Sequence, residues 1–247
     1  MPYPTALVTG GSRGIGRAIV KQLFEQGYHV AINYFHSEDQ AVALAQELNQ
    51  NTAGNRAIAV CADVSEALQI ERMFTYTKKN LGRVSVLVNN TGIAQQKLFT
   101  DISEQEWDAM FAVNVKSIFL CCQQALPDMI HYKQGKIINI SSMWGQIGAS
   151  CEVHYSASKA AVIGLTKALA KEVGPSQIQV NCIAPGVIHT DMNSHLDLSI
   201  LHQLEEETPL GTIGSVQDIA HMVGFLASEH AKFITGQVFG VNGGMVM

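Results

Sequence analysis

Short apolar runs rich in β-branched residues recur along the chain, and segments with apolar residues at helical spacing separate them. Most runs are nearly continuous rather than alternating, which is typical of strands covered on both faces. The pattern predicts strands at residues 5–10, 28–34, 56–63, 84–92, 135–142, 178–186 and 236–244. Helical spacing is clear at residues 12–27, 37–50, 65–80, 156–173 and 215–228.

Strands that alternate with helices predict an α/β fold with a doubly wound, seven-stranded parallel sheet and helices on both faces, of the Rossmann type. Without a linker or repeat, residues 1–247 are expected to form a single domain. One interval, residues 193–214, is polar and leaves the carboxyl end of the strand at 178–186, where α/β sheets bind ligands. A substrate lid is therefore expected at about 187–214, and a surface excursion without a role is the alternative.

The composition fits a compact globular protein, with 47% hydrophobic and 15% charged residues. A net charge of −5 gives no reason to expect nucleic acid or an anionic membrane as a partner. The chain shows no membrane-spanning run and no leader pattern, so a cytoplasmic location is expected. The 5 cysteines have no CxxC spacing and no nearby histidine pairs, so neither a disulfide framework nor a metal site is expected.

A glycine-rich loop, TGGSRGIG at residues 9–16, joins the first strand to the first helix. Gly10 permits a tight turn, Gly14 lets the backbone approach a pyrophosphate, and Gly16 allows the helix to pack closely on the strand. In this position the loop predicts a dinucleotide site. The second strand ends without an acid, and Arg13 lies in the loop, so NADP(H) is favoured over NAD(H). Glu38 and Asp39 argue mildly the other way.

Tyr155 and Lys159 are four residues apart at the start of a helical segment. Residues at this spacing share one helix face, so a cation is expected beside a phenol. Ordinary polar residues at a helix start are the alternative interpretation.

Taken in order, several motifs make the whole chain resemble a classical short-chain dehydrogenase/reductase. They are the glycine loop, Asp63, the run Asn89-Asn90-Thr91-Gly92, Asn114, Ser142, Tyr155-Ser156-Ala157-Ser158-Lys159 and Pro185-Gly186. The resemblance implies four catalytic residues, Ser142, Tyr155, Lys159 and Asn114. It also implies homotetramers built with the last helices and the final strand.

The chemistry of ketone reduction suits these residue types. Hydride comes from a nicotinamide, and Tyr155 can donate the proton that the developing alkoxide needs. Lys159 beside it and a cationic nicotinamide are both expected to favour the phenolate, and Ser142 is expected to hydrogen-bond the substrate oxygen. By resemblance, Lys159 also holds the nicotinamide ribose, and Asn114 holds a water that connects Lys159 to solvent. Capping or bridging a helix is the alternative for Asn114.

The dinucleotide is expected to contact residues from several segments. Asp63 and Val64 would lie at the adenine and Asn90 near the adenosine ribose, although Asp63 could simply end a strand. Thr91 replaces the usual alanine of the family, and its hydroxyl is expected to find a backbone partner. The full set is Gly10, Ser12, Arg13, Gly14, Ile15, Gly16, Asn33, Tyr34, Asp63, Val64, Asn90, Gly92, Tyr155, Lys159, Pro185, Gly186, Ile188 and Thr190.

Within the family, the glycine loop, the Asn-Tyr end of the second strand and the ending FITGQVFGVNGG are similar to 3-oxoacyl-acyl-carrier-protein reductases. This implies reduction of a 3-oxoacyl thioester in fatty-acid biosynthesis, with acyl carrier protein as partner. Such enzymes dock the acidic carrier with basic residues near the mouth of the site. Lys133 keeps one of these charges, but Ser176 and its neighbours lack the expected arginine, which weakens this interpretation.

Residues 141–159, SSMWGQIGASCEVHYSASK, resemble instead the active-site segment of elongation factor P 5-aminopentanone reductases. These enzymes reduce a ketone on a modified lysine, and that substrate carries an amine. Glu152 is then expected to meet the cationic group and Trp144 to wall the pocket; a solvated or base-paired Glu152 is the alternative. A non-catalytic nucleotide-binding protein is a more remote alternative, because the catalytic set is intact.

Overall fold

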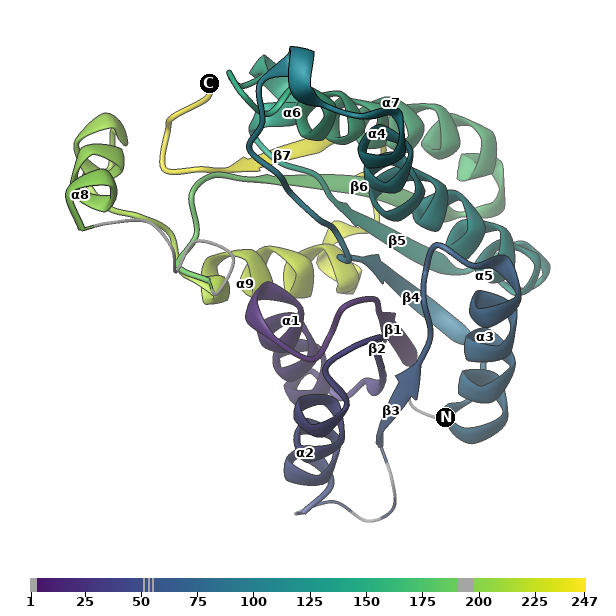
Figure 1. Ribbon diagram of the computed structural model, residues 1–247. Helices are drawn as coiled ribbons and strands as arrows, with labels where there is room; N and C mark the ends of the chain where they lie inside the picture. Colours follow the sequence, from purple (N-terminus) through teal and green to yellow (C-terminus); the bar gives the residue numbers. More distant parts are fainter. Residues whose placement is uncertain (1–3, 51, 53, 55, 191–197) are drawn as a thin grey trace.

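The computed structural model describes residues 4–50, 52, 54, 56–190 and 198–247. A parallel sheet with the strand order β3-β2-β1-β4-β5-β6-β7 crosses the molecule (Figure 1). Its strands are β1 (Thr5–Val8), β2 (His29–Tyr34), β3 (Ala57–Cys61), β4 (Val84–Asn89), β5 (Gly135–Ile140), β6 (Ile178–Pro185) and β7 (Val238–Val241). The predicted α/β fold is therefore confirmed, and the observed strands lie inside the predicted ranges.

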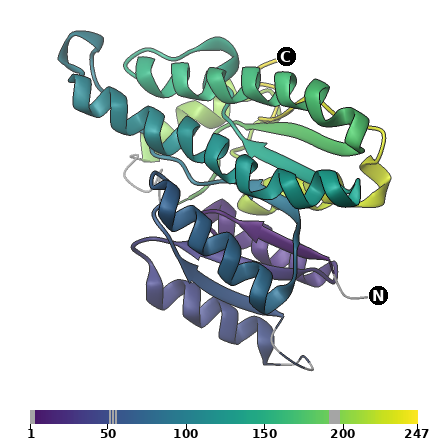
Figure 2. The ribbon, with the colours of Figure 1, turned by 90° about the vertical axis from the view of Figure 1, so that its right-hand side faces the viewer.

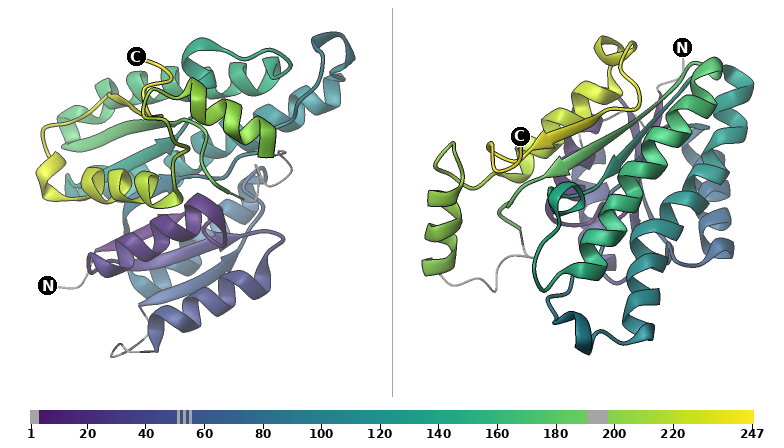
Figure 3. Two further views of the ribbon diagram at one scale, coloured as in Figure 1. Left: turned by 90° about the vertical axis from the view of Figure 1, so that its left-hand side faces the viewer. Right: turned by 90° about the horizontal axis from the view of Figure 1, so that it is seen from above.

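Helices cover both faces of this sheet. α1 (Gly14–Glu25), α2 (Glu38–Asn49) and α9 (Val216–Ala227) lie on one face (Figure 3, left). α3 (Ala67–Leu81), α5 (Ser117–Tyr132) and α7 (Val153–Val173) lie on the other (Figure 2). Two further helices, α4 (Glu104–Phe111) and α6 (Trp144–Ile147), precede α5 and α7 along the chain.

The two covered faces explain why the strands are apolar throughout. In β1, Ala6 and Val8 belong to the core under α1, α2 and α9, whereas Leu7 between them belongs to the core under α3, α5 and α7. Successive side chains of a strand point to opposite faces, so in a strand that is buried on both sides every position favours an apolar residue.

The expectation that no segment is long and apolar enough to cross a membrane was wrong by length and composition: one continuous helical stretch, Glu104–Tyr132, meets both criteria. It consists of α4, a π-helical turn at Ala112–Lys116, and α5. Its residues Cys121 and Met129 are fully buried among the side chains of β4, β5 and α3. The stretch is therefore a core helix of this domain.

The strand order reverses between β1 and β4, which places a crevice for ligands at the carboxyl ends of these strands. Of the interval expected to form a lid, residues 191–197 lie outside the described residues. The remainder contains α8 (Leu198–Glu207), which lies at the periphery of the molecule (Figure 1), and a bridge between Ile188 and Gly214. The lid stays a prediction.

Candidate active site

The glycine loop has the shape that its sequence predicts. Gly10 and Gly14 have φ angles of +61° and +52°, in the left-handed region that favours glycine. A Cβ added to Gly16 would lie 2.1 Å from the carbonyl oxygen of Gly10, so no side chain fits there. The loop thus leaves its backbone open to close approach, as a dinucleotide pyrophosphate requires.

The amino end of α1 suits a phosphate. Its N-cap residue Arg13 makes no side-chain capping bond, and no acid occupies the first turn, so the first N–H groups of the helix can face an anion. Arg13 also lines a surface hollow of about 280 Å³ with His36 and Ser37. The guanidinium could pair with an anionic group at this hollow, although Glu38 and Asp39 line it too and oppose that charge.

Two predicted cofactor residues hold the loop with their side chains. Asn33 accepts a 3.2 Å hydrogen bond from the Gly10 N–H, and its amide nitrogen donates to three backbone carbonyls, including that of Ala62 at 3.0 Å. Asn90 donates to the carbonyls of Thr9 and Gly10. Because these amides already have partners, they shape the dinucleotide site and leave the loop backbone to face the ligand.

The remaining predicted cofactor residues differ in whether their side chains or only their backbone could contact a ligand. Tyr34, Val64 and Ile188 are buried, and the side chains of all three belong to the two cores, which leaves mainly their backbone to contact a ligand. Ser12 is also buried. Pro185 and Gly186 continue the end of β6, where their backbone bonds to Met143 and Val241, and the methyl group of Thr190 faces Gly14.

The side chain of Asp63 has a structural role in a turn, and the hydroxyl of Thr91 lacks the backbone partner expected from the sequence. One carboxylate oxygen of Asp63 accepts hydrogen bonds from the N–H and the hydroxyl of Ser65, so this side chain closes the turn before α3. The expectation for Thr91 was wrong. Its Oγ1 is buried without a hydrogen-bond partner.

The two serines after β5 have different partners. Ser142 Oγ accepts a 3.2 Å hydrogen bond from the N–H of Trp144, the first residue of α6, which leaves its own hydrogen free to donate. Ser141 is buried and donates a 2.8 Å bond to the carbonyl of Lys159. Ser141 therefore joins β5 to α7, and Ser142 is the serine that can serve a substrate.

Tyr155 and Lys159 share one face of α7, as their spacing predicts. The amine of Lys159 lies 5.7 Å from the centroid of the Tyr155 ring. That amine is buried and donates a 3.0 Å hydrogen bond to the carbonyl of Ile140, the last residue of β5. The site therefore brings Ser142, Tyr155 and Lys159 together at the carboxyl end of β5.

The electrostatics differ from the simple expectation that Lys159 lowers the pKa of Tyr155. Burial raises the pKa of Tyr155 to about 12, against a hydrogen bond with Ser142 that lowers it, and the charge of Glu152 raises it further. Burial also lowers the pKa of Lys159 to about 8. Desolvation is thus the largest effect on both groups, and the phenol keeps its proton at neutral pH.

Asn114 reaches this site from the π-helical turn. It accepts from the N–H of Ile93 at 2.9 Å, and its amide nitrogen donates to the carbonyl of Ile93 and to the hydroxyl of Ser158. Ser158 in turn donates to the carbonyl of Tyr155 at 2.7 Å. Asn114 therefore links the loop after β4 to α7, and π turns are frequent at functional sites.

The predicted substrate residues lie at the mouth of the site. Trp144 begins α6 and is half-buried. Glu152 precedes α7, and its carboxylate accepts a 3.3 Å hydrogen bond from the amide of Gln96. Within the described part of the chain Glu152 takes part in no ion pair, which leaves its charge uncompensated.

A second network near Tyr155 was not evident from the sequence. His154 is fully buried, and its Nε2 lies 3.0 Å from Gln95, whose amide donates to Glu106 at 2.9 Å. Glu106 also pairs with Lys97. In the sequence, this network is indicated only by the polar run QQK at residues 95–97, which follows a predicted strand. The contact between Gln95 and His154 joins residues 59 positions apart, so it requires the fold.

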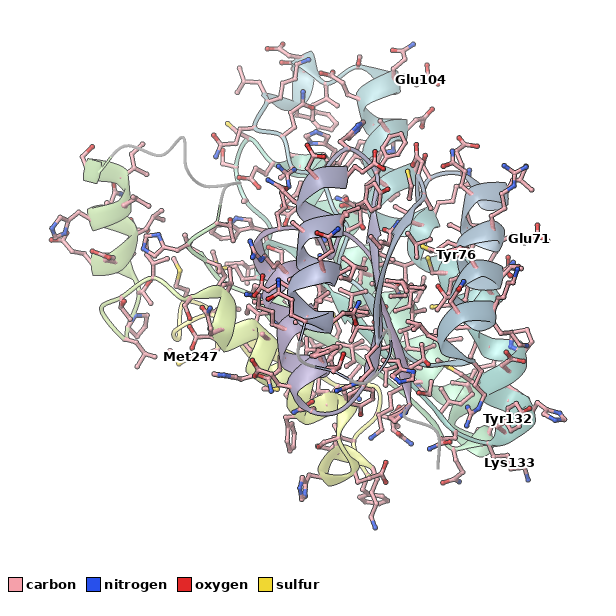
Figure 4. All side chains as sticks on the ribbon, turned by 90° about the horizontal axis from the view of Figure 1, so that it is seen from below. Glu71, Tyr76, Glu104, Tyr132, Lys133 and Met247 are labelled. Atoms are coloured by element: carbon pink, nitrogen blue, oxygen red, sulfur yellow. The ribbon has the colours of Figure 1, made fainter. Side chains whose placement is uncertain are left out.

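The two positions considered for carrier docking, Lys133 and Ser176, lie away from the mouth of the site. Lys133 immediately precedes the amino end of β5, whereas Ser142 follows the carboxyl end of that strand. Figure 4 shows Lys133 and Glu104 at opposite ends of the molecule. Ser176 likewise precedes the amino end of β6. The expectation that these positions lie near the mouth of the site is therefore wrong within one chain.

Comparisons with known proteins agree with this geometry. A family model described as enoyl-(acyl carrier protein) reductase matches residues 10–246. A 3-oxoacyl-[acyl-carrier-protein] reductase from Staphylococcus aureus is 44% identical and covers 98% of both chains. One from Chlamydia trachomatis is 41% identical and covers 98% of this chain and 96% of its own.

Two solved structures are also similar. A blue fluorescent protein from a metagenomic library, in complex with NADPH, has a TM-score of 0.93 at 36% identity and covers 100% of this chain and 99% of its own. A putative gluconate dehydrogenase from Agrobacterium tumefaciens has a TM-score of 0.94 at 32% identity, with 100% and 98% covered.

Proposed function

Because this chain belongs to the short-chain dehydrogenase/reductase family, and is thus an oxidoreductase acting on CH–OH and C=O groups, we propose that it reduces a ketone with NADPH. The observation that carries the proposal is the convergence of the Tyr155 phenol, the Ser142 hydroxyl and the buried amine of Lys159 at the carboxyl end of β5. A proton donor and an orienting hydroxyl are what a developing alkoxide needs.

Each group has a distinct task in this mechanism. NADPH, when bound along the glycine loop, would supply the hydride. Tyr155 donates its proton to the carbonyl oxygen as negative charge develops there, and Ser142 donates a hydrogen bond to the same oxygen. Lys159, with a pKa of about 8, is largely protonated at pH 7 and is the stronger acid of the pair, so it favours reprotonation of the phenolate.

Arg13 supports the choice of NADPH, since its guanidinium borders the hollow that suits a 2′-phosphate. The similar metagenomic protein was solved in complex with NADPH. Titrating the fluorescence of reduced nicotinamide on binding measures both dissociation constants. Arg13→Ala should weaken NADPH binding about tenfold and leave NADH binding unchanged, as loss of one phosphate contact implies. Equal losses for both cofactors would contradict this assignment.

The first candidate substrate is a 3-oxoacyl thioester carried by acyl carrier protein, because relatives with 44% identity bear that name. The test is NADPH oxidation with an acetoacetyl thioester, both free and on the carrier, with Tyr155→Phe as control. Activity that improves on the carrier and disappears in the variant supports this substrate. Activity indifferent to the carrier would exclude it.

The second candidate is an amine-bearing ketone, such as the modified lysine of elongation factor P. The unpaired charge of Glu152, three residues before Tyr155, favours it. Glu152→Gln should raise KM for an amine-bearing ketone and spare a neutral ketone of the same length, and equal effects on both would exclude this role. Tight NADPH binding without reduction of any ketone would instead revive the non-catalytic alternative.

The homotetramer and the cytoplasmic location stay predictions. β7 is the edge strand of the sheet, and Phe233 near it is almost fully exposed, at 99%. An uncovered strand edge with an exposed aromatic side chain suits an interface between subunits. Light scattering during gel filtration would measure the mass directly.

A further inference from the structure

Two segments form the outer border of the catalytic site. Residues 93–104 follow the carboxyl end of β4, and residues 144–152 follow that of β5, on the same edge of the sheet as Ser142. The N–H of Lys97 donates a 2.7 Å hydrogen bond to the carbonyl of Cys151, and Gln96 donates to Glu152. These bonds hold the first segment beside the start of the catalytic helix.

This border exposes large apolar side chains. Leu98 is 60% exposed, Phe99 64% and Ile147 61%. Leu98 and Phe99 adjoin the short 3-10 turn Phe99–Asp101, and Ile147 ends α6. Apolar side chains gathered at the mouth of a site, with polar residues around them, are characteristic of an interaction surface.

The same border is acidic. Residues 93–104 and 144–152 contain three carboxylates, one lysine and no arginine. The lysine, Lys97, is bound to Glu106 at 2.7 Å, so it offers no positive charge to a partner. Asp101 and Glu104 are exposed and belong to no ion pair within the described residues. An acidic partner would be repelled here and a basic one attracted.

We propose that this acidic–apolar rim, defined as Leu98, Phe99, Asp101, Glu104 and Ile147, binds a basic segment of a protein that presents its ketone to Tyr155. The inference rests on the proposed ketone reduction and adds the chemistry of the partner. It favours the second candidate substrate over the first, because acyl carrier protein is acidic. Leucine or similar side chains of the segment would cover the apolar positions. Its lysines or arginines would face Asp101 and Glu104.

Binding can be measured independently of catalysis. The probes are two fluorescent peptides that share a leucine-containing core and differ only in flanking lysines or flanking glutamates. Fluorescence anisotropy at low salt should show about tenfold tighter binding of the lysine peptide, and this preference should shrink as salt is raised. Equal binding of both peptides, or tighter binding of the glutamate peptide, would overturn the proposal.

Variants locate the surface. The double change Asp101→Asn with Glu104→Gln should weaken the lysine peptide about fivefold, and Phe99→Ser should weaken both peptides. Glu71→Gln on α3, exposed and outside the two segments (Figure 4), is the matched control and should have no effect. Unchanged affinity in the rim variants would refute the rim as the binding surface.

Reduction of a small neutral ketone is followed in the same preparations. If the wild type does not reduce the ketone but still prefers the lysine peptide, the proposed ketone reduction is refuted and the proposed binding surface is retained. If the wild type reduces the ketone but binds both peptides equally, only the proposed binding surface is refuted.

Discussion

A Cβ added to Gly92 would lie only 3.1 Å from the amine of Lys159. Asn114 Oδ1 borders the same point at 3.3 Å, so the bare glycine lets both polar atoms converge beside the β4 loop. A methyl group here would make a contact tighter than ordinary van der Waals distance, so the lysine amine would have to shift by a few tenths of an ångström from its hydrogen bond with Ile140.

Gly92→Ala should therefore lower kcat about tenfold with little loss of stability, because small displacements of catalytic groups are costly. Steady-state kinetics and thermal unfolding check this. The control is Gly164→Ala on α7, where nothing lies within 4 Å and activity should be retained. A Gly92→Ala enzyme with normal kcat would show that the lysine position is not critical.

Ser141 and Ser142 offer a matched pair. Ser142→Ala should reduce kcat about 100-fold with an unchanged melting temperature, since its hydroxyl is available to the developing oxyanion. Ser141→Ala should instead lower the free energy of unfolding by about 1 kcal/mol, because it removes a buried hydrogen bond to the Lys159 carbonyl. Steady-state kinetics and chemical denaturation measure these effects. If Ser141→Ala lowered kcat and Ser142→Ala lowered stability, Ser141 would be the serine that serves the substrate.

The sequence predicts the fold well because strands covered on both faces are apolar throughout and contrast with the helices. The Tyr155–Lys159 pair is equally local, since one helix turn separates the residues. The position of Asn114 depends instead on a π-helical turn, which no hydrophobic period reveals. Nor does the sequence show that Lys133 lies at the opposite edge of the sheet, because that depends on the direction of β5.

The pKa of Tyr155 was beyond sequence reasoning for a different reason. A neighbouring cation lowers a phenol pKa, and burial raises it. Only the three-dimensional environment decides which effect is larger, and here burial dominates. The contact between Glu152 and Gln96 spans 56 residues and likewise requires the fold.

Thr91→Ala should stabilise the protein. The threonine hydroxyl is buried without a partner, and an unsatisfied buried polar group costs about 1 kcal/mol or more. The melting temperature of the unliganded protein is the measurement, and Thr91→Val, which keeps the shape without the hydroxyl, should act in the same direction. Lower stability in both variants would mean that the hydroxyl has a partner, such as a bound water.

Lys159→Met should change how stability depends on pH. The folded pKa of Lys159 is lowered from 10.5 to about 8, so between these values the unfolded state binds more protons. The free energy of unfolding contributed by Lys159 therefore rises with pH in this window, and below pH 8 the buried charge destabilises the wild type fully. From pH 7 to pH 10 the wild type should gain about 2 kcal/mol relative to the variant.

Denaturant unfolding at both pH values measures this difference, and the comparison cancels the other titrating groups. Any constant cost of leaving the Ile140 carbonyl without its donor cancels as well. Lys167→Met, an exposed position on the same helix, is the control and should show no such gain. If the difference between Lys159→Met and wild type were equal at both pH values, Lys159 would keep an ordinary pKa, and its role as the acid that restores the Tyr155 proton would fail with it.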